Sequence, residues 1–159
     1  MSKEITTLPS GLQYYRDWDQ DGHVVMVNPK TIKRYNELKY DKGAHPDASQ
    51  YGVFFAFSDK QFDEGYNSLV KRGYIKDGDK VKKAVAGLFG TFEEIKRFYE
   101  FYRERDELVK AECDPQEVYF YEYNNYECMY SYEGDQEAYN AVADIWDKDI
   151  ANKLYRLRY

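Results

Sequence analysis

Residues 50–73 constrain the fold more than any other stretch, because a strand pattern passes directly into a helix start there. Residues 53–57 read Val-Phe-Phe-Ala-Phe, and such a continuous apolar run is typical of a strand covered on both faces, centrally in a sheet. Ser58 and Gln61 have capping-box spacing, in which the hydroxyl accepts from the first turn and the amide reaches back. Apolar side chains then recur at helical spacing from Phe62 onward, which predicts a helix.

The other patterns predict a mixture of helices and strands. A β-branched run at residues 23–27 predicts a strand, and Thr91 with Glu94 repeats the capping-box spacing before a long helix. Two shorter helices are expected after Asp135 and Asp147. Because regular strand–helix–strand alternation is lacking, we predict an α+β fold, with a mixed, largely antiparallel sheet and several helices packed mainly on one face.

Length and cysteine content favour one domain in a reducing compartment. We expect a single domain over residues 1–159, with residues 1–10 as a flexible tail. Cys113 and Cys128 have no companions at metal-binding or redox spacing, which favours free thiols and a cytoplasmic location. No stretch has the length of a membrane span or the apolar core of a signal peptide, so we expect no membrane contact.

Residues 118–132 alternate in the manner of a β-hairpin. Asn124 and Asn125 would form its two-residue turn, because asparagine tolerates the positive φ angles that such a turn requires. In that register one face is a row of tyrosines, and two glutamates lie opposite each other at the tip of the other face. The residues of this predicted partner-binding surface are Tyr119, Tyr121, Glu122, Tyr123, Tyr126, Glu127 and Tyr130.

Acidic residues are concentrated in the same region. Eleven Asp and Glu residues from Glu112 to Asp149 accompany a single cation, Lys148, whereas the net charge of the whole chain is -6. An anionic surface interleaved with tyrosine suits a basic partner, because such surfaces steer association. The first hypothesis is therefore a non-enzymatic protein that binds a basic protein, for example one that handles nucleic acid. The alternative is ordinary solubility charge around a tyrosine-rich hairpin.

Residues 50–57 suggest a second class of function, the binding of nucleic acid. Their aromatic run resembles the strand on which RNA-recognition motifs stack bases, although the preceding basic residue and the βαβ order of those domains are absent. The basic cluster that follows consists of Lys71, Arg72, Lys76, Lys80, Lys82 and Lys83. These side chains could neutralise phosphates, although Asp77 and Asp79 weaken their field. Buried strand aromatics and a solvated basic face are the alternatives.

Reactive side chains match no catalytic or metal-binding motif. His45 and Asp47 are two ligand types at short spacing, but a metal site needs three or four converging ligands. The loop at residues 87–91 precedes a helix start, where an anion could bind, but it lacks both the Walker lysine and the GxGxxG spacing. We therefore predict no catalytic residues, no metal and no cofactor. An enzyme of unrecognised type is the third hypothesis.

Three stretches of the chain resemble a group of small proteins. These are residues 51–65, residues 87–91, and residues 143–146 with 149–151. In their general residue pattern they resemble uncharacterised small acidic accessory proteins of bacterial phages and conjugative elements. The resemblance implies an accessory protein of a mobile element, a class that often includes inhibitors of host defence. It assigns no site residues.

Overall fold

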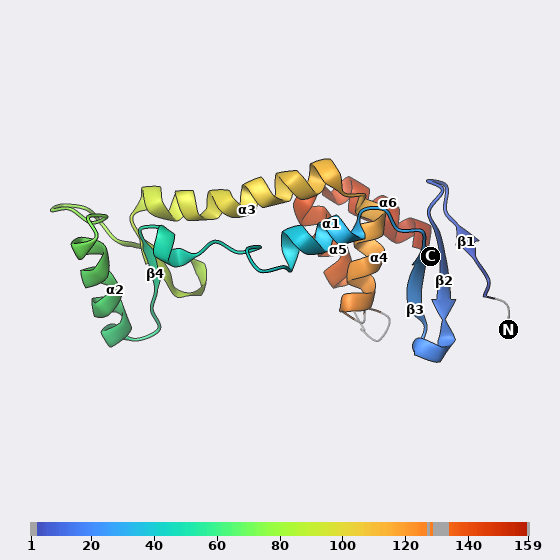
Figure 1. Cartoon of the computed structure of the whole chain (residues 1–159), viewed down its shortest axis with the longest axis horizontal. Coiled ribbons are helices and arrows are strands. Elements are labelled where there is room, and N and C mark those ends of the chain that lie inside the picture. Colours follow the sequence, from blue (N-terminus) through green and yellow to red (C-terminus); the bar gives the residue numbers. More distant parts are fainter. Residues whose placement is uncertain (1–2, 127, 129–133, 159) are drawn as a thin grey trace. The chain divides into compact units, whose positions relative to one another are not determined.

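The computed structural model describes residues 3–126, 128 and 134–158, and the chain divides into two compact units (Figure 1). Unit 1 comprises Met1–Asp41 and Asp106–Tyr159, and unit 2 comprises Lys42–Arg105. Each unit combines helices with a three-stranded antiparallel sheet, which confirms the predicted α+β class. The strands thus form two small sheets, where we had expected one.

The elements alternate between strands and helices in an irregular order. Unit 1 begins with β1 (Thr6–Thr7), β2 (Gln13–Asp17), β3 (His23–Val27) and α1 (Ile32–Lys39). Unit 2 contains β4 (Val53–Phe55), α2 (Asp59–Lys71), β5 (Lys82–Lys83), β6 (Leu88–Gly90) and most of α3 (Phe92–Glu112). Unit 1 resumes near the end of α3 and adds α4 (Pro115–Asn125), α5 (Gln136–Ile145) and α6 (Lys148–Arg158). Strand β1 and the buried Leu8 lie within the stretch predicted as a tail.

Helix α4 is the central element of unit 1, where it packs against β3, α1, α5 and α6 (Figure 1). The predicted hairpin is therefore wrong for residues 118–125, and residues 127 and 129–133 lie outside the described residues. Asp114 accepts from the backbone of Gln116 at 2.8 Å and of Glu117 at 3.3 Å, and Pro115 occupies the first turn. The Asp114-Pro115 pair thus starts a helix. Because α4 is buried nearly all round, it lacks the one-sided apolar stripe that identifies a surface helix.

A side chain of α4 pairs with the outer edge of β3 at one residue, Val24. The backbone N–H of Val24 donates to Asn124 Oδ1 at 2.9 Å, and Asn124 Nδ2 donates to the Val24 carbonyl oxygen. Asn124, which we predicted to lie in a hairpin turn, therefore occupies the place of a neighbouring strand. At Val24 the edge is therefore unavailable for pairing with another chain.

The sheet of unit 2 has the order β4-β6-β5, so that β6 is central and β4 lies at an edge. The predicted central position of residues 53–57 is therefore wrong. One face of β4 packs closely on α2. The Phe54 ring of β4 lies so near to Gly65 of α2 that a Cβ at this glycine would overlap the ring. Phe55, on the other face, is 47% exposed, so the strand is not covered on both sides as expected.

The predicted helix starts of unit 2 are confirmed. Gln61 N donates to Ser58 Oγ at 3.2 Å, and Gln61 Oε1 accepts from Phe57 N at 2.8 Å. At the start of α3, Glu94 N donates to Thr91 Oγ1 at 3.4 Å. The side chain of this glutamate does not complete a capping box, because its carboxylate accepts from Gly52 N, in another segment of the unit.

Candidate functional site

The predicted tyrosine and glutamate surface does not form in the described residues. Tyr119, Glu122 and Tyr123 are 1%, 0% and 2% exposed, because α4 is the core helix of its unit. Tyr121 is partly buried, and its hydroxyl donates to Asn36 Oδ1 at 2.6 Å. Among the predicted residues that the structure describes, Tyr126 alone is exposed, and Glu127 and Tyr130 lie outside the described ranges. The predicted row of tyrosines is therefore corrected to a set of core phenols.

Glu122 lies inside unit 1 with hydrogen-bond donors around its carboxylate. Tyr40 donates its hydroxyl at 2.6 Å, Asn125 donates its amide at 2.9 Å, and Lys39 Nζ lies at 3.9 Å. Burial, and then the proximity of Glu122, raise the pKa of the Tyr40 hydroxyl. A carboxylate bonded in this way stabilises the fold and offers nothing to a partner.

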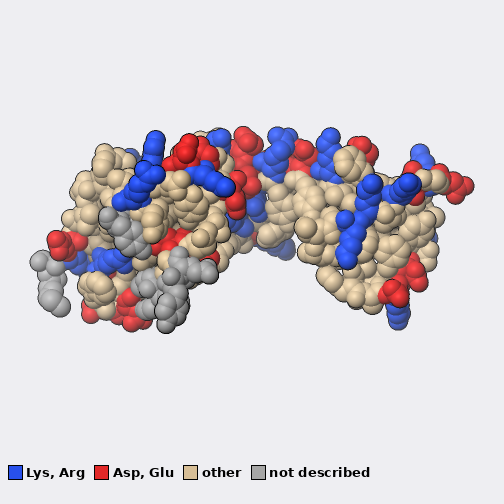
Figure 2. All heavy atoms as spheres, turned by 180° about the vertical axis from the view of Figure 1, so that it is seen from behind, with Lys and Arg blue, Asp and Glu red and all other residues tan. Residues whose placement is uncertain are grey.

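The acidic residues from Glu112 to Asp149 also do not form the expected face. Glu117, Glu122 and Asp135 are buried, and Glu112 pairs with Arg34 at 2.9 Å. The other exposed carboxylates of this stretch, among the residues described, are distributed over the start of α4, both ends of α5 and the start of α6: Asp114, Glu137, Asp144, Asp147 and Asp149. On the face of the molecule that Figure 2 displays, acidic and basic side chains lie interspersed. The local excess of acid in the sequence is thus dispersed.

Unit 2 contains a groove that we name the Phe57 groove. It has a volume of about 450 Å³ and is lined by Ala56, Phe57, Ser58, Asp59, Phe62, Lys83, Ala86, Gly87 and Phe89. The ring of Phe57 is 77% exposed, whereas Phe62 and Phe89 are half-buried and pack edge to face, with ring centroids 5.1 Å apart. The groove is therefore an aromatic cavity with an exposed ring at its rim.

The Phe57 ring lies against the backbone at Gly87, where a side chain would leave no room for it. The φ of Gly87, 75°, lies in the left-handed region, and a Cβ there would approach the Phe57 ring to 2.7 Å. The Gly87 carbonyl oxygen accepts from Ala56 N at 3.0 Å, which joins the two segments just before the ring. The sequence indicated only a turn at Gly87, because the ring that this glycine supports belongs to a segment well before it in the chain.

Of the predicted basic cluster, one lysine lines the groove and its neighbour Lys82 points to the other face of the strand. Lys83 lines the groove, and Lys83 Nζ lies 5.9 Å from the centroid of the Phe89 ring. Lys82 precedes it on the edge strand β5 and is exposed. Unit 2 contains twelve Lys and Arg residues and ten Asp and Glu residues, so its net charge is +2. Because the whole chain has a net charge of -6, unit 1 has a net charge of -8. The groove therefore lies on the less acidic part of the chain.

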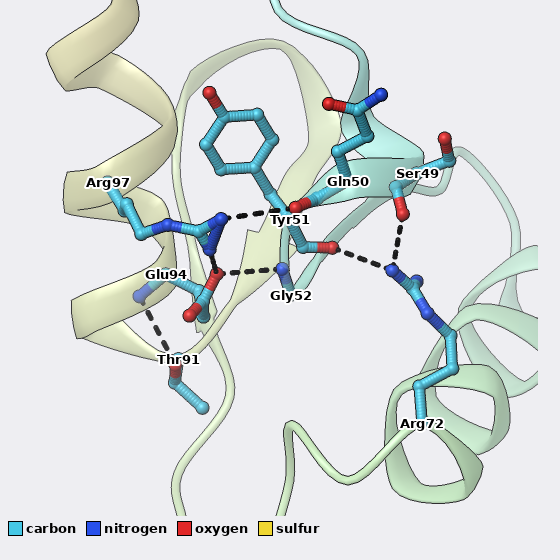
Figure 3. A network of polar contacts seen from close by, with 8 residues as sticks. All are labelled: Ser49, Gln50, Tyr51, Gly52, Arg72, Thr91, Glu94 and Arg97. Atoms are coloured by element: carbon cyan, nitrogen blue, oxygen red, sulfur yellow. Dashed lines mark hydrogen bonds and ion pairs between the residues drawn. The ribbon is translucent and has the colours of Figure 1, made fainter.

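Arg72, by contrast, is part of a structural network and not of a binding surface (Figure 3). Its Nη2 donates to the Ser49 carbonyl oxygen at 2.5 Å and to that of Tyr51 at 3.2 Å. Lys71 lies at the C-terminal end of α2, whereas the groove lies at the N-terminal end. The predicted cluster is thus not one patch.

Figure 3 also shows how α3 holds the same segment. Glu94 Oε2 accepts from Gly52 N at 2.8 Å and from Arg97 Nη1 at 2.9 Å. Arg97 Nη2 donates to the Gln50 carbonyl oxygen at 3.2 Å, and its guanidinium lies 4.5 Å from the centroid of the Tyr51 ring. These contacts fix residues 49–52 ahead of β4 and give the strand that leads to Phe57 a rigid base.

The other candidate reactive groups have structural partners. His45 Nδ1 lies 3.1 Å from the Tyr102 hydroxyl, and both cysteines are buried. Within the described ranges, no three His, Cys, Asp or Glu side chains are grouped so that they could hold a metal ion. None of the helices in those ranges combines the length and apolarity that crossing a membrane requires.

The two units define a small α+β protein with an aromatic groove. The chain belongs to a family of unknown function (DUF7659), whose model matches residues 38–156. The match includes all of unit 2, the helices α4 and α5 and most of α6, and it begins after the sheet of β1 to β3. No curated protein and no solved structure matches the chain. The resemblance to accessory proteins of phages and conjugative elements stays a prediction.

Proposed function

We propose that the protein is a non-enzymatic module that binds single-stranded nucleic acid at the Phe57 groove. The observation that supports this most directly is the exposed ring of Phe57 at the rim of an aromatic cavity that also contains Lys83. Bases stack on exposed aromatic rings, and each stacked base contributes about 1–3 kcal/mol to binding. Such stacking tolerates any sequence, because every base presents a π-face.

Lys83 favours an anionic ligand next to the stacked base. It is exposed on β5 and is paired in register with Phe89, a wall of the groove. A phosphate that follows a base on Phe57 would lie within the field of this ammonium group. Aromatic contacts and backbone neutralisation are the two components of single-strand binding.

A single strand fits the groove better than a duplex does. Duplex bases are stacked on one another and present only their edges in the grooves, whereas an unpaired base offers its face. The groove is concave and aromatic, which suits a planar ring that enters it. Duplex binding would need a broad basic surface, and Arg72 and Lys71 do not extend one from the groove.

The charges also predict that binding is weak. Asp59 lines the groove, and unit 1 has a net charge of -8. If Lys83 neutralises one phosphate, the affinity should fall by about two- to threefold between about 50 and 200 mM salt. A much steeper dependence would require cations that the groove does not supply.

Fluorescence anisotropy with labelled oligothymidylate and oligouridylate tests the proposal, with a duplex of equal length as the comparison. We expect binding of the single strands at low salt, weaker binding of the duplex, and a loss on Lys83→Ala. The matched control is Lys96→Ala, because Lys96 is exposed in the same unit and does not line the groove. Failure to bind either single strand at low salt would refute the proposed function.

We do not propose the first hypothesis, in which the surface of tyrosines and glutamates binds a basic protein. Its central residues, Tyr119, Glu122 and Tyr123, are core residues of unit 1, so they cannot contact a partner without unfolding of α4. A role in a mobile element is compatible with a single-strand-binding module, because replication and transfer of such elements expose single strands. That role stays part of the proposal.

A further inference from the structure

The Phe57 groove contains an open carboxylate next to its exposed ring. Asp59 lines the groove together with Phe57 and Ser58, and its side chain is exposed. None of the residues that the structure describes donates a hydrogen bond to this carboxylate or forms an ion pair with it. Given single-strand binding at the Phe57 groove, as proposed above, we infer that Asp59 makes the groove select guanine among the bases.

The position of Asp59 places an acceptor beside a stacked base. Asp59 is the first residue of α2, two positions after Phe57, and both residues line the same groove. The groove volume of about 450 Å³ lies within the roughly 300–1,000 Å³ of small-molecule sites. A base on the Phe57 ring therefore has room to turn one of its edges toward the carboxylate.

The chemistry of a carboxylate distinguishes guanine from the other bases. An ionised carboxylate only accepts hydrogen bonds, and it does so through two oxygens. Guanine presents two adjacent donors, N1–H and N2–H, on its Watson–Crick edge. Adenine and cytosine present one amino donor beside an acceptor nitrogen, and thymine and uracil present one N–H between two carbonyl oxygens. A pair of parallel, charge-assisted bonds to the carboxylate is therefore available to guanine alone.

Ser58 supplies a donor next to this acceptor. Its Oγ accepts from Gln61 N at 3.2 Å, so the hydroxyl proton remains to be donated. Guanine O6 is an acceptor beside N1–H, and a hydroxyl donor beside a carboxylate matches that order. Thymine and uracil would instead turn a carbonyl oxygen toward the carboxylate, which is unfavourable.

The start of α2 keeps the acceptor in its charged form. Asp59 is the acidic residue of the first turn, and the positive end of the helix dipole there stabilises an ionised carboxylate. A carboxylate at this position also stabilises its own helix without any ligand. A purely helix-stabilising role is therefore the outcome that a test has to separate from base selection.

The test uses fluorescence anisotropy at low salt with strands that carry a single base among abasic sites. The base is guanine, adenine or hypoxanthine, which lacks the amino group at N2, and oligothymidylate is measured alongside. We expect the guanine strand to bind about five- to tenfold more tightly than the adenine strand, with the hypoxanthine strand between them. Adenine is the proper comparison, because both purines present a ring of similar size to Phe57.

Asp59→Asn and a matched control make the test specific. Because the amide has one acceptor oxygen and its nitrogen donates, Asp59→Asn should reduce the guanine-to-adenine affinity ratio to about one. The lost negative charge should strengthen binding of every strand, and the ratio cancels that effect. Asp63→Asn, at an exposed position of α2 that does not line the groove, should retain the full ratio.

The outcomes separate this inference from the function on which it rests. If oligothymidylate binds but guanine, adenine and hypoxanthine strands bind equally, base selection is refuted and single-strand binding stands. An unchanged ratio in Asp59→Asn would equally refute the role of Asp59 and leave it as a helix-stabilising residue. Binding of none of the strands would overturn both proposals.

Discussion

The carboxylate of Glu117 on α4 accepts the backbone N–H of Thr31 at 2.7 Å, across 86 positions of the sequence. It also accepts from Lys30 N at 2.9 Å and from the Thr31 hydroxyl at 2.5 Å. Thr31 is the cap residue of α1 but makes no side-chain bond to its own helix. The Glu117 side chain of the core helix therefore accepts hydrogen bonds from the backbone N–H groups at the start of α1. Its negative charge interacts favourably with the positive N-terminal end of that helix.

Replacement of Glu117 by Ala should destabilise the protein by about 2–4 kcal/mol, because buried N–H groups lose a charged acceptor. Urea unfolding measures the free energy, with Glu107→Ala on the exposed face of α3 as the control. A loss no larger than that of the control would show that water replaces the carboxylate at no cost.

Tyr35 should make stability fall at alkaline pH. The residue is fully buried, and burial, followed by the nearby Glu122, raises the pKa of its hydroxyl above the ordinary 10.0. The folded protein therefore keeps the proton at a pH where the unfolded chain loses it. The resulting stability is complete below pH 10 and declines above it, by up to about 1.4 kcal/mol per pH unit.

Urea unfolding of Tyr35→Phe at a series of pH values from about 9 to 11 checks this expectation. The decline above pH 10 should be shallower in Tyr35→Phe than in the unsubstituted protein. Tyr155→Phe, at an exposed tyrosine, should retain the full slope. If stability declined with pH equally in all three proteins, the decline could not be assigned to Tyr35.

Local signals in the sequence predicted local structure well. Ser58 with Gln61, Thr91, and Asp147, which accepts from Ile150 N at 2.8 Å, each start a helix where the spacing indicated. Such signals involve neighbours within one turn, so the sequence alone carries them. The predicted helices after them were confirmed as α2, α3 and α6.

Signals that depend on burial were misinterpreted. The alternation in residues 118–125 indicated a strand, yet α4 is surrounded by the rest of its unit and buries Glu117 and Glu122 among tyrosines. Partners from other segments, such as Thr31 and Tyr40, make that burial possible, and no local pattern reveals them. The exposure of Phe57 was hidden in the same way, because a continuous apolar run predicted a covered strand, whereas β4 ends at Phe55 and Phe57 lies beyond it, just before the cap of α2.

The two cysteines should react slowly in the folded protein. Burial raises the pKa of the Cys113 thiol and of the Cys128 thiol, so little thiolate is present near neutral pH. A thiol-specific colorimetric reagent should therefore label them slowly in buffer and quickly in urea. Rapid labelling of either thiol without denaturant would show that its segment opens readily.

Gly87→Ala should both destabilise the protein and disturb the Phe57 groove. The added Cβ costs about 1–2 kcal/mol in the left-handed conformation and also meets the Phe57 ring at 2.7 Å. Gly78→Ala is the matched control, because Gly78 has a φ of 87° and no atom within 4 Å of the added Cβ. We expect weaker oligothymidylate binding by Gly87→Ala alone. Equal binding by the two variants would show that Gly87 is not needed for binding at the groove.

Stacking of a base on Phe57 is the step on which the proposed function depends, and the affinity of Phe57→Ala for oligothymidylate at low salt measures it. Phe92→Ala is the control, because Phe92 is 60% exposed in the same unit and does not line the groove. Loss of one stacked base predicts about five- to 150-fold weaker binding by Phe57→Ala and no change for Phe92→Ala. Equal affinity of Phe57→Ala and the unsubstituted protein, with both folded, would show that Phe57 stacks no base.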